Sequence, residues 1–393
     1  MSNAGERKLG LGVAGLGRAF TLMLPTFAAD PRVALVAAAD TRAEARQRFA
    51  ADFAAKSYAT VEELCADPAV EAVYVATPHQ FHARHAVLAA QHGKHLLIEK
   101  PMALSLADCS AIIAAVERAR VALVIGHSHS FDAPVARLRA LIESGAFGPV
   151  RMINAINYTD YLYRPRRPEE LDTAQGGGAV FNQAAHQIDM VRLVGGGRVE
   201  SVRALTGAWD AARPTEGAYA ALLTFAGGAF ASLTYGGFGH FDSDEWQGWI
   251  GEMGQAKAPY PGPSRPRFAS PQEEAAFKNA RNYGGGDYRP LPAGAPAHQH
   301  FGTLLVSCAH ADLRALSSGV MIYQNGTARL DPVPPPAVPR AEVIDELYAA
   351  VVHGAVPRHG GAWGMATLEV VLAVLRSARE GRDITLTHQV GLP

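Results

Sequence analysis

The first 127 residues alternate between short apolar runs and longer stretches with helical spacing. The runs contain few polar residues, which is typical of strands that are buried on both faces of a parallel sheet. Strands and helices in alternation are joined by right-handed crossovers and build a doubly wound sheet. The sequence therefore predicts an α/β domain over residues 1–127. Its expected strands are Leu9–Ala14, Val33–Ala39, Val70–Val75, Leu96–Ile98 and Ala122–Ile125.

Helix boundaries are marked between these runs. Thr60 with Glu63 and Ser105 with Asp108 have the spacing of capping boxes. Gly93 is expected to end a helix that begins near residue 80, and Pro25 lies inside the first helix, which it should kink. These signals place helices between the strands.

After residue 126 the apolar runs become longer and partly alternating, a pattern that favours a mostly antiparallel sheet. Residues 128–393 are therefore predicted to form a second, α+β domain with an open sheet and helices on one face. Residues 255–300 are rich in Pro and Gly and are expected to be an irregular insertion, either a lid, an oligomer arm or a disordered loop. The expected strands are Val150–Asn157, Arg198–Thr206, Ala218–Phe225 and Ala229–Tyr235, and the expected helices are Asn182–Val194, Ala341–Val352 and Met365–Arg379.

Charge and cysteine content exclude several classes of function. The formal net charge is −1 without a block of like charges, which argues against nucleic-acid and anionic-membrane binding. We see no apolar run of membrane-spanning length and no signal peptide. The three cysteines are scattered and are expected to be reduced thiols. We expect a cytoplasmic protein that acts on a small molecule.

A glycine-rich turn follows the first strand and precedes a helix. Gly15 allows the tight turn, Gly17 lets the backbone approach a pyrophosphate, and the helix N-terminus offers N–H groups to phosphate. The third glycine of this fingerprint is replaced by Phe20. Asp40 at the end of the second strand is placed to accept hydrogen bonds from ribose hydroxyls, which favours NAD. NADP stays possible because Arg42 is close by.

Three further segments carry a family resemblance: Ala76–Ala83 (ATPHQFHA), Glu99–Pro101 (EKP) and Gly176–Asp189 (GGGAVFNQAAHQID). With the glycine turn before them, they make the chain resemble the glucose–fructose oxidoreductase / inositol dehydrogenase / MocA (Gfo/Idh/MocA) family over essentially its whole length. The resemblance implies a Rossmann domain, an open-sheet second domain, and substrate held beside the nicotinamide. It also implies a homodimer or homotetramer joined through the second sheet.

The resemblance assigns chemistry to two residues. Lys100 follows a parallel strand at the edge where ligands of such sheets bind, and its ammonium can stabilise an alkoxide or act as acid/base. His186 lies where the family has its active-site histidine and can accept the carbinol proton. Asn182 stands where the family usually has aspartate, so it can orient a neighbour but cannot stabilise an imidazolium by charge. Which of Lys100 and His186 accepts the proton stays open.

The remaining candidates are assigned by position. We expect cofactor contacts from Gly15, Leu16, Gly17, Arg18, Ala19, Phe20, Asp40, Thr41, Arg42, Thr77, Pro78, His82, Glu99 and Lys100. We expect substrate contacts from His129, Gln183, Arg164, Arg166 and Arg167. The three arginines lie among prolines, and their guanidinium groups match carboxylates, although they could instead pair with the neighbouring Glu169 and Glu170.

No metal site is expected. His79, His82 and His85 recur every three residues, but no carboxylate or thiol joins them.

The favoured function is oxidation of a carboxylated cyclic cis-diol. Residues 11–25, 161–173 and 242–254 look most like the group that converts phthalate 4,5-dihydrodiol to 4,5-dihydroxyphthalate. A sugar or inositol dehydrogenase is the alternative within the same chemistry. From other classes, an NAD-dependent glycosidase would produce no net NADH, and a cofactor-sensing regulator would turn over no diol. Fold analogy alone cannot separate them.

Overall fold

The computed structural model describes residues 7–260, 268–291 and 294–392. The chain divides into two compact units. Unit 1 comprises Met1–His127, Ala275–Gly294 and Val338–Met365, and unit 2 comprises Ser128–Glu274, Ala295–Ala337 and Ala366–Pro393. The first boundary follows residue 127, but two later segments that the sequence assigns to the second domain are part of unit 1.

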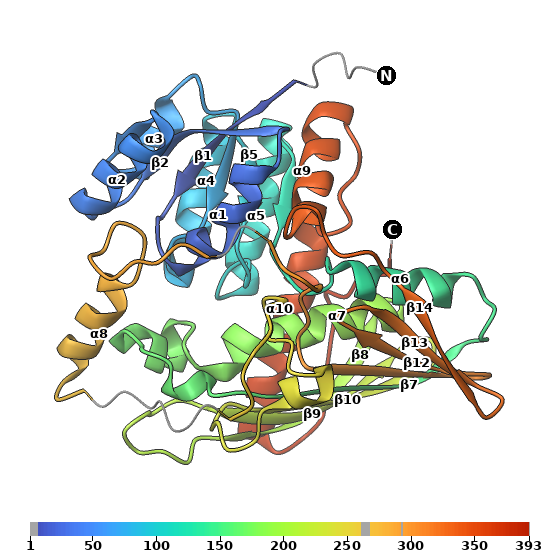
Figure 1. The fold of residues 1–393 in the computed structure, drawn as a ribbon. Coiled ribbons are helices and arrows are strands. Elements are labelled where there is room, and N and C mark those ends of the chain that lie inside the picture. The colour runs from blue at the N-terminus through green and yellow to red at the C-terminus, as the bar shows by residue number, and fades with distance from the viewer. Residues whose placement is uncertain (1–6, 261–267, 292–293, 393) are drawn as a thin grey trace. The chain divides into compact units, whose positions relative to one another are not determined.

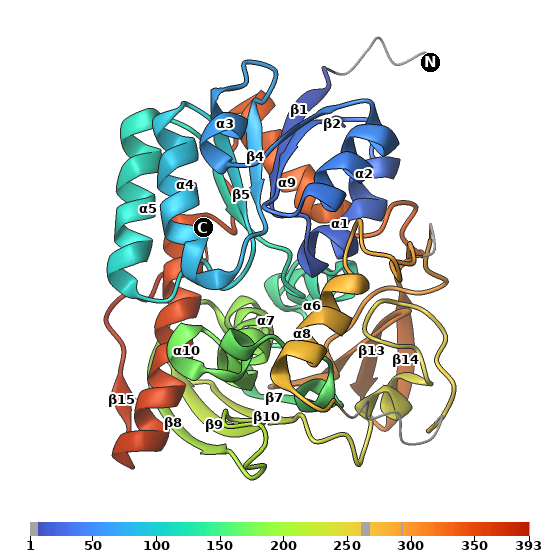
Figure 2. The same cartoon turned by 90° about the vertical axis from the view of Figure 1, so that its left-hand side faces the viewer.

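Unit 1 contains the parallel sheet that the sequence predicts. Among the described residues it has six parallel strands in the order β3-β2-β1-β4-β5-β6, so strands are added on one side of β1 up to β3 and on its other side from β4 onward. The strands are β1 (Leu9–Ala14), β2 (Val33–Ala39), β3 (Lys56–Tyr58), β4 (Ala72–Val75), β5 (His95–Ile98) and β6 (Leu123–Ile125). The helices that pack around this sheet in Figure 2 are α1 (Arg18–Ala29), α2 (Ala43–Phe53), α3 (Val61–Ala66), α4 (His82–Gln91), α5 (Leu106–Ala119) and α9 (Ala341–His353).

The sequence signals for helix ends have visible counterparts. Thr60 and Glu63 form a reciprocal capping box at the start of α3. The Ser105 hydroxyl accepts from the Asp108 amide at the start of α5. Pro25 lies inside α1. At the starts of α3 and α5 a local interaction between residues three positions apart fixes the boundary, which is why sequence could predict it.

Unit 2 contains an open, mostly antiparallel sheet, as predicted. Its described residues form nine strands in the order β14-β13-β12-β11-β7-β10-β9-β8-β15, and only β7 and β10 pair in parallel among them. They are β7 (Val150–Tyr158), β8 (Val199–Gly207), β9 (Ala218–Phe225), β10 (Phe230–Gly236), β11 (Thr303–Cys308), β12 (Asp312–Leu316), β13 (Gly319–Gln324), β14 (Thr327–Pro332) and β15 (Ile384–Thr385). Figure 1 shows α6 (Ala133–Glu143) and α7 (Ala185–Gly195) over one face of this sheet.

The irregular insertion predicted over 255–300 contains a helix, α8 (Pro271–Ala280). Residues 261–267 and 292–293 of the insertion lie outside the described residues. The sequence interpretation missed α8 because its first turns are strongly polar, and no long apolar stripe marks it.

One described helix, α10 (Gly361–Glu380), meets the length and composition of a membrane span, with a mean hydropathy of 1.2 in the relevant window. Glu369 and Arg376 interrupt this helix, so the sequence shows no uninterrupted apolar run of that length. Because 56% of that window is buried inside the protein, α10 has the character of a core helix, and its composition is weak evidence for a membrane span.

Candidate functional site

The turn after β1 is shaped for close backbone approach. Gly15 has φ of +96°, and a Cβ there would lie 2.8 Å from the Ala76 carbonyl oxygen, so glycine is needed. Gly17 is the N-cap of α1 and no side chain of the described structure caps it. A Cβ on Gly17 would meet no protein atom within 4 Å. The open space at Gly17 and the start of α1 at Arg18 and Ala19 can therefore receive a pyrophosphate.

Asp40 follows β2 and is bonded to that same turn. Its Oδ2 accepts from the Leu16 amide at 2.8 Å, and its Oδ1 accepts from the Arg42 amide at 2.8 Å. The Arg42 guanidinium also pairs with this carboxylate, at 3.2 Å from Nε to Oδ1. The Thr41 carbonyl accepts from Arg46. The predicted ribose-binding carboxylate is thus already part of an ion pair.

Phe20, in place of the third glycine, points into the interior of unit 1. It is fully buried, and its ring lies 6.1 Å from Phe49 of α2 and 5.1 Å, edge-on, from Tyr283. The side chain therefore packs α1 and α2 together instead of facing a phosphate. This contact explains why a large residue is compatible with the turn.

His82 connects the loops that follow β4 and β5. Its ring nitrogens lie 2.8 Å from the Thr77 carbonyl oxygen and 2.9 Å from the Pro101 carbonyl oxygen. Burial lowers the pKa of His82 to about 4, although both carbonyls oppose the shift. Pro78 is the N-cap of the short 3-10 turn His79–Phe81 that leads to His82. A neutral His82 thus holds the backbone beside Lys100 in place.

Glu99 is turned inward. The Tyr74 hydroxyl donates to its Oε1 at 2.5 Å, and burial raises the pKa of the Glu99 carboxyl. Lys100 is partly exposed and follows β5, at the carboxyl edge of the sheet where Gly15 and Thr77 also lie. Since all six strands are parallel, the predicted cofactor residues gather at one edge.

The three histidines near α4 have separate contacts. His79 and His82 meet edge to face at 5.5 Å between ring centroids, and His85 Nδ1 lies 3.0 Å from the Thr77 hydroxyl. Within residues 7–260, 268–291 and 294–392, no group of three His, Cys, Asp or Glu side chains could hold a metal ion.

In unit 2, a π-helical turn (Val180–Ala184) leads into α7 and carries the predicted substrate-side residues. Such turns are frequent at functional sites. The Asn182 amide donates to the carbonyls of Gly176 and Gly178, at 3.1 and 2.9 Å, so it supports the glycine loop. The Gln183 Oε1 accepts from Tyr235 at 3.3 Å.

His186, one turn further on, lies against a second buried histidine. The ring centroids of His186 and His129 are 4.8 Å apart. His129 is held on both sides, because its Nδ1 donates to Asp132 at 2.7 Å and its Nε2 lies 3.6 Å from Glu252. Burial disfavours the charged ring, but these two carboxylates outweigh it and raise the pKa of His129.

Aromatic side chains frame the histidine pair. The Phe301 ring lies 5.0 Å from both histidine rings and stacks at 6.3 Å on Tyr235. Tyr235 in turn stacks on Tyr219 at 5.5 Å. The His186 ring is thus surrounded by aromatic rings on one hand and by His129 with its two carboxylate partners on the other.

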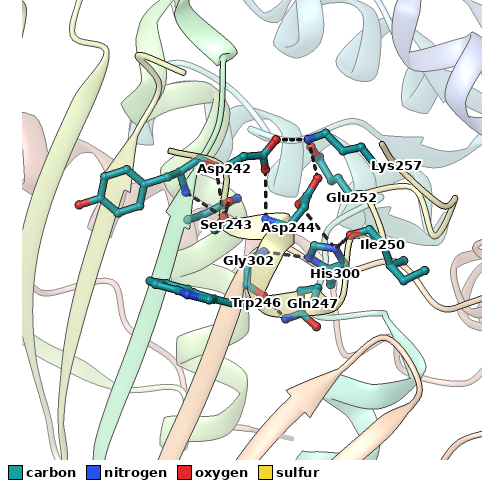
Figure 3. A network of polar contacts seen from close by, with 12 residues as sticks. Asp242, Ser243, Asp244, Trp246, Gln247, Ile250, Glu252, Lys257, His300 and Gly302 are labelled. Carbon is teal, nitrogen blue, oxygen red and sulfur yellow. Dashed lines mark hydrogen bonds and ion pairs between the residues drawn. The ribbon is translucent and has the colours of Figure 1, made fainter. Parts of the chain in front are cut away.

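Glu252 is carried by a loop that a polar network fixes, shown in Figure 3. Lys257 pairs with Asp242 and Asp244, with 2.8 Å to the latter. His300 Nε2 lies 2.7 Å from the Ile250 carbonyl, two residues before Glu252. These contacts order the loop that presents Glu252 to His129.

The arginine loop is largely paired with its own neighbours. Arg167 contacts Glu169 and Glu170 at 3.0 and 3.4 Å, the pairing that the sequence analysis weighed as the alternative. Arg166 lies over the Tyr161 ring at 3.9 Å and donates to its carbonyl.

Arg164 has a different environment. It pairs with Asp160 at 2.8 Å, and its Nη1 lies 3.9 Å from Oε2 of Glu252. Its side chain is 42% exposed. Of the three arginines, Arg164 is therefore the one that shares a partner with the buried histidine pair.

Sequence reasoning missed Asp132, Glu252 and Tyr283. The Asp132 signal was available, since it follows His129 by three residues in a chain segment that already drew attention. Glu252 and Tyr283 lie in irregular segments far along the chain, and their contacts are visible only in the folded structure.

Two family models match the chain: "Oxidoreductase family, NAD-binding Rossmann fold" over residues 9–127, and "GFO/IDH/MocA C-terminal domain" over residues 135–257. A dehydrogenase of 1-carboxy-3-chloro-3,4-dihydroxycyclohexa-1,5-diene from Comamonas testosteroni is 49% identical over 380 residues, covering 94% of each chain. A myo-inositol 2-dehydrogenase from Thermotoga maritima is 30% identical over 49% of this chain and 56% of its own.

The crystal structure of a putative dehydrogenase from Bordetella bronchiseptica RB50 has the same fold throughout. It is 42% identical, has a TM-score of 0.90, and is matched over 96% of this chain and all of its own. The likeness thus extends over both units.

Proposed function

Since the chain belongs to the Gfo/Idh/MocA family of NAD-binding oxidoreductases, we propose that this dehydrogenase oxidises a carboxylated cyclohexadiene diol. The observation that carries the proposal is the end-to-end likeness to the Comamonas testosteroni enzyme, whose substrate is a ring diol with a carboxyl group. Where the carbon that bears the second hydroxyl also carries a hydrogen, oxidation of the other carbinol gives a ketone that enolises to an aromatic catechol, so the reaction has a strong driving force.

The glycine turn and Asp40 supply the features that NAD needs. The Gly15–Gly17 backbone and the uncapped start of α1 can hold the pyrophosphate. A carboxylate has about four lone-pair sites, so Asp40 can accept from a ribose hydroxyl in addition to Leu16 and Arg42. When bound, NAD accepts the hydride from the carbinol carbon.

The hydroxyl proton requires a base from the protein. In this proposal, a ring nitrogen of His186 or the Lys100 amine takes that proton, and Lys100 Nζ stabilises the developing alkoxide. The His129 ring, 4.8 Å from the His186 ring between centroids, can place a positive charge beside that base. Asp132 and Glu252 support this role by stabilising the His129 charge.

Arg164 is our candidate for the substrate carboxylate. Its side chain is 42% exposed, and its guanidinium lies beside Glu252, which also faces His129. The stacked rings of Phe301 and Tyr235 suit a flat cyclohexadiene. A carboxylate would compete with Asp160 and Glu252 for the guanidinium, and its bidentate geometry favours that exchange.

Among carboxylated diols, the two candidate substrates are one with two carboxyl groups and one with a single carboxyl group. The sequence resemblance favours phthalate 4,5-dihydrodiol, with two carboxyl groups, whereas the Comamonas testosteroni enzyme acts on a chlorinated ring with one. A sugar or inositol substrate is the alternative, supported by the partial match to the Thermotoga maritima enzyme.

The test is the initial rate of NADH formation with purified protein. The panel contains the phthalate dihydrodiol, a monocarboxylated dihydrodiol with and without chlorine, an uncharged dihydrodiol and myo-inositol. We expect the highest kcat/KM with one of the carboxylated diols. Preference for myo-inositol would transfer the proposal to the alternative, and turnover of glycosides without net NADH would refute a dehydrogenase role on diols.

A further inference from the structure

Residues 281–285, which follow α8, form a short strap against the cofactor-binding sheet's helices. The strap belongs to Ala275–Gly294, a segment of unit 1 that is preceded and followed in sequence by unit 2. Figure 2 shows this segment rising from α8 toward α1. Tyr283 at its centre is fully buried. A surface loop would leave such a ring exposed, so the strap is a packed element of the Rossmann unit.

Two contacts anchor the strap. The Tyr283 hydroxyl donates to Asp52 of α2 at 2.7 Å, and its ring meets Phe20 of α1. Gly284 has φ of +81°, and a Cβ there would lie 2.5 Å from the Ala45 Cα and 2.8 Å from the Ala45 nitrogen. The strap backbone thus presses on the first turn of α2 at a distance that only glycine allows.

The strap also contacts Arg42, the side chain that could bind the 2′-phosphate of NADP. Arg42 donates from Nη1 to the Tyr283 carbonyl at 3.2 Å, from Nη2 to the Leu16 carbonyl at 2.9 Å, and from Nε to Asp40 at 3.2 Å. Every guanidinium nitrogen therefore has an acceptor, and the Tyr283 carbonyl comes from outside the first 127 residues.

The net charge of Asp40 and Arg42 would by itself discriminate only weakly between NAD and NADP. Asp40 repels a 2′-phosphate, but its ion pair with Arg42 has no net charge. To bind that phosphate, Arg42 would have to turn away from Asp40, and it is the natural residue to do so because guanidinium groups bind phosphate bidentately. Selectivity for NAD over NADP then depends on whether the Arg42 guanidinium is kept in its ion pair with Asp40.

We propose that the 281–285 strap is a selectivity element: it holds Arg42 on Asp40 and thereby favours NAD over NADP. The strap's carbonyl fixes one end of the guanidinium, and the glycine contact with α2 fixes the strap. The inference rests on NAD binding by this unit and extends it to a segment far along the chain.

The test compares Gly284→Ala with Gly286→Ala. The first substitution forces a Cβ into the α2 backbone, whereas a Cβ at the exposed Gly286 would meet nothing within 4 Å. Dissociation constants for NAD and NADP are measured by titration calorimetry without substrate. We expect the NADP-to-NAD ratio of dissociation constants to fall about tenfold in Gly284→Ala and to stay at the wild-type value in Gly286→Ala.

Two further variants keep the test decisive if Gly284→Ala folds poorly. Tyr283→Phe removes the Asp52 bond without a steric change and should shift the ratio in the same direction. Adding Arg42→Ala to either strap variant should abolish the gain in NADP affinity, because the released guanidinium is what binds the phosphate. An unchanged ratio in both folded strap variants would overturn the proposal. Failure of the wild type to bind NAD would instead count against the cofactor assignment itself.

Discussion

His129 donates a hydrogen bond from Nδ1 to Asp132 across 2.7 Å, and both side chains are almost completely buried. With Glu252 on the opposite ring nitrogen, this pair keeps a histidine charged over a wider pH range beside His186. We propose that this arrangement gives His129 a positioning and electrostatic role, separate from the proton transfer proposed for His186 or Lys100.

Removing the Asp132 charge should lower the pKa of His129. The pKa of His129 is raised in the folded protein above its unfolded value of about 6.5. The charged ring therefore adds fully to the free energy of unfolding below pH 6.5, and this contribution is lost as pH rises through the folded pKa. In Asp132→Asn, the fall in unfolding free energy with rising pH should become shallower. NMR titration of the His129 ring and denaturant unfolding at several pH values measure the two effects. Asp383→Asn, at an exposed position, is the control, and an unaltered His129 titration in Asp132→Asn would contradict the account.

Lys100→Met and His186→Ala should each reduce kcat by roughly 10²-fold or more, the scale of positioned acid/base groups. NAD affinity should change little. Steady-state kinetics and cofactor titration check both statements, with Lys56→Met and His310→Ala as exposed controls. Near-normal kcat in both site variants would show that the proton and alkoxide roles are misassigned.

Asp40→Ala should weaken the preference for NAD. Its carboxylate orients both Leu16 and Arg42, so its loss frees the guanidinium as well as removing the negative charge. The ratio of kcat/KM for the two cofactors measures the effect. A wild-type preference for NADP would contradict this assignment.

Local signals in the sequence predicted much of the fold. β1 and β2 match their predicted bounds because buried parallel strands are apolar throughout. By contrast β11, β12, β13 and β14 were not predicted. Of these, β14 is exposed along most of its length, so no buried apolar run marks it. These strands form by pairing with one another and with β7 in the sheet of unit 2.

Some residues of the candidate site could likewise be identified from local sequence, and others could not. Gly15, Asp40 and His186 could be placed from motifs, because each motif reflects one local geometry. The partners of His129 and Arg42 could not, since Glu252 and Tyr283 are more than a hundred residues away along the chain. Burial and ion pairing of this kind depend on tertiary contacts.

We propose that the protein associates through the second sheet. Leu205, Leu222 and Phe230 are 67%, 48% and 43% exposed on three adjacent strands, and a symmetric partner could bury them. Leu222→Glu should therefore shift the protein toward monomer in light scattering at micromolar concentration. Val356→Glu, at an exposed apolar residue of unit 1, should not. A wild type that is only monomeric would refute the proposal.

The most direct test of the proposed substrate is a cycle of enzyme variants and diols. Wild type and Arg164→Ala are each assayed for NADH formation with a carboxylated cyclohexadiene diol and with its uncharged analogue. Arg166→Ala and Arg167→Ala are further arms, and Arg329→Ala is the exposed control. A charged hydrogen bond contributes about 1.5–3 kcal/mol, so Arg164→Ala should raise KM for the acid about ten- to a hundredfold and leave the neutral diol nearly unchanged. Equal effects on both diols in every arginine variant, or better turnover of neutral polyols by the wild type, would contradict the carboxylated-diol function.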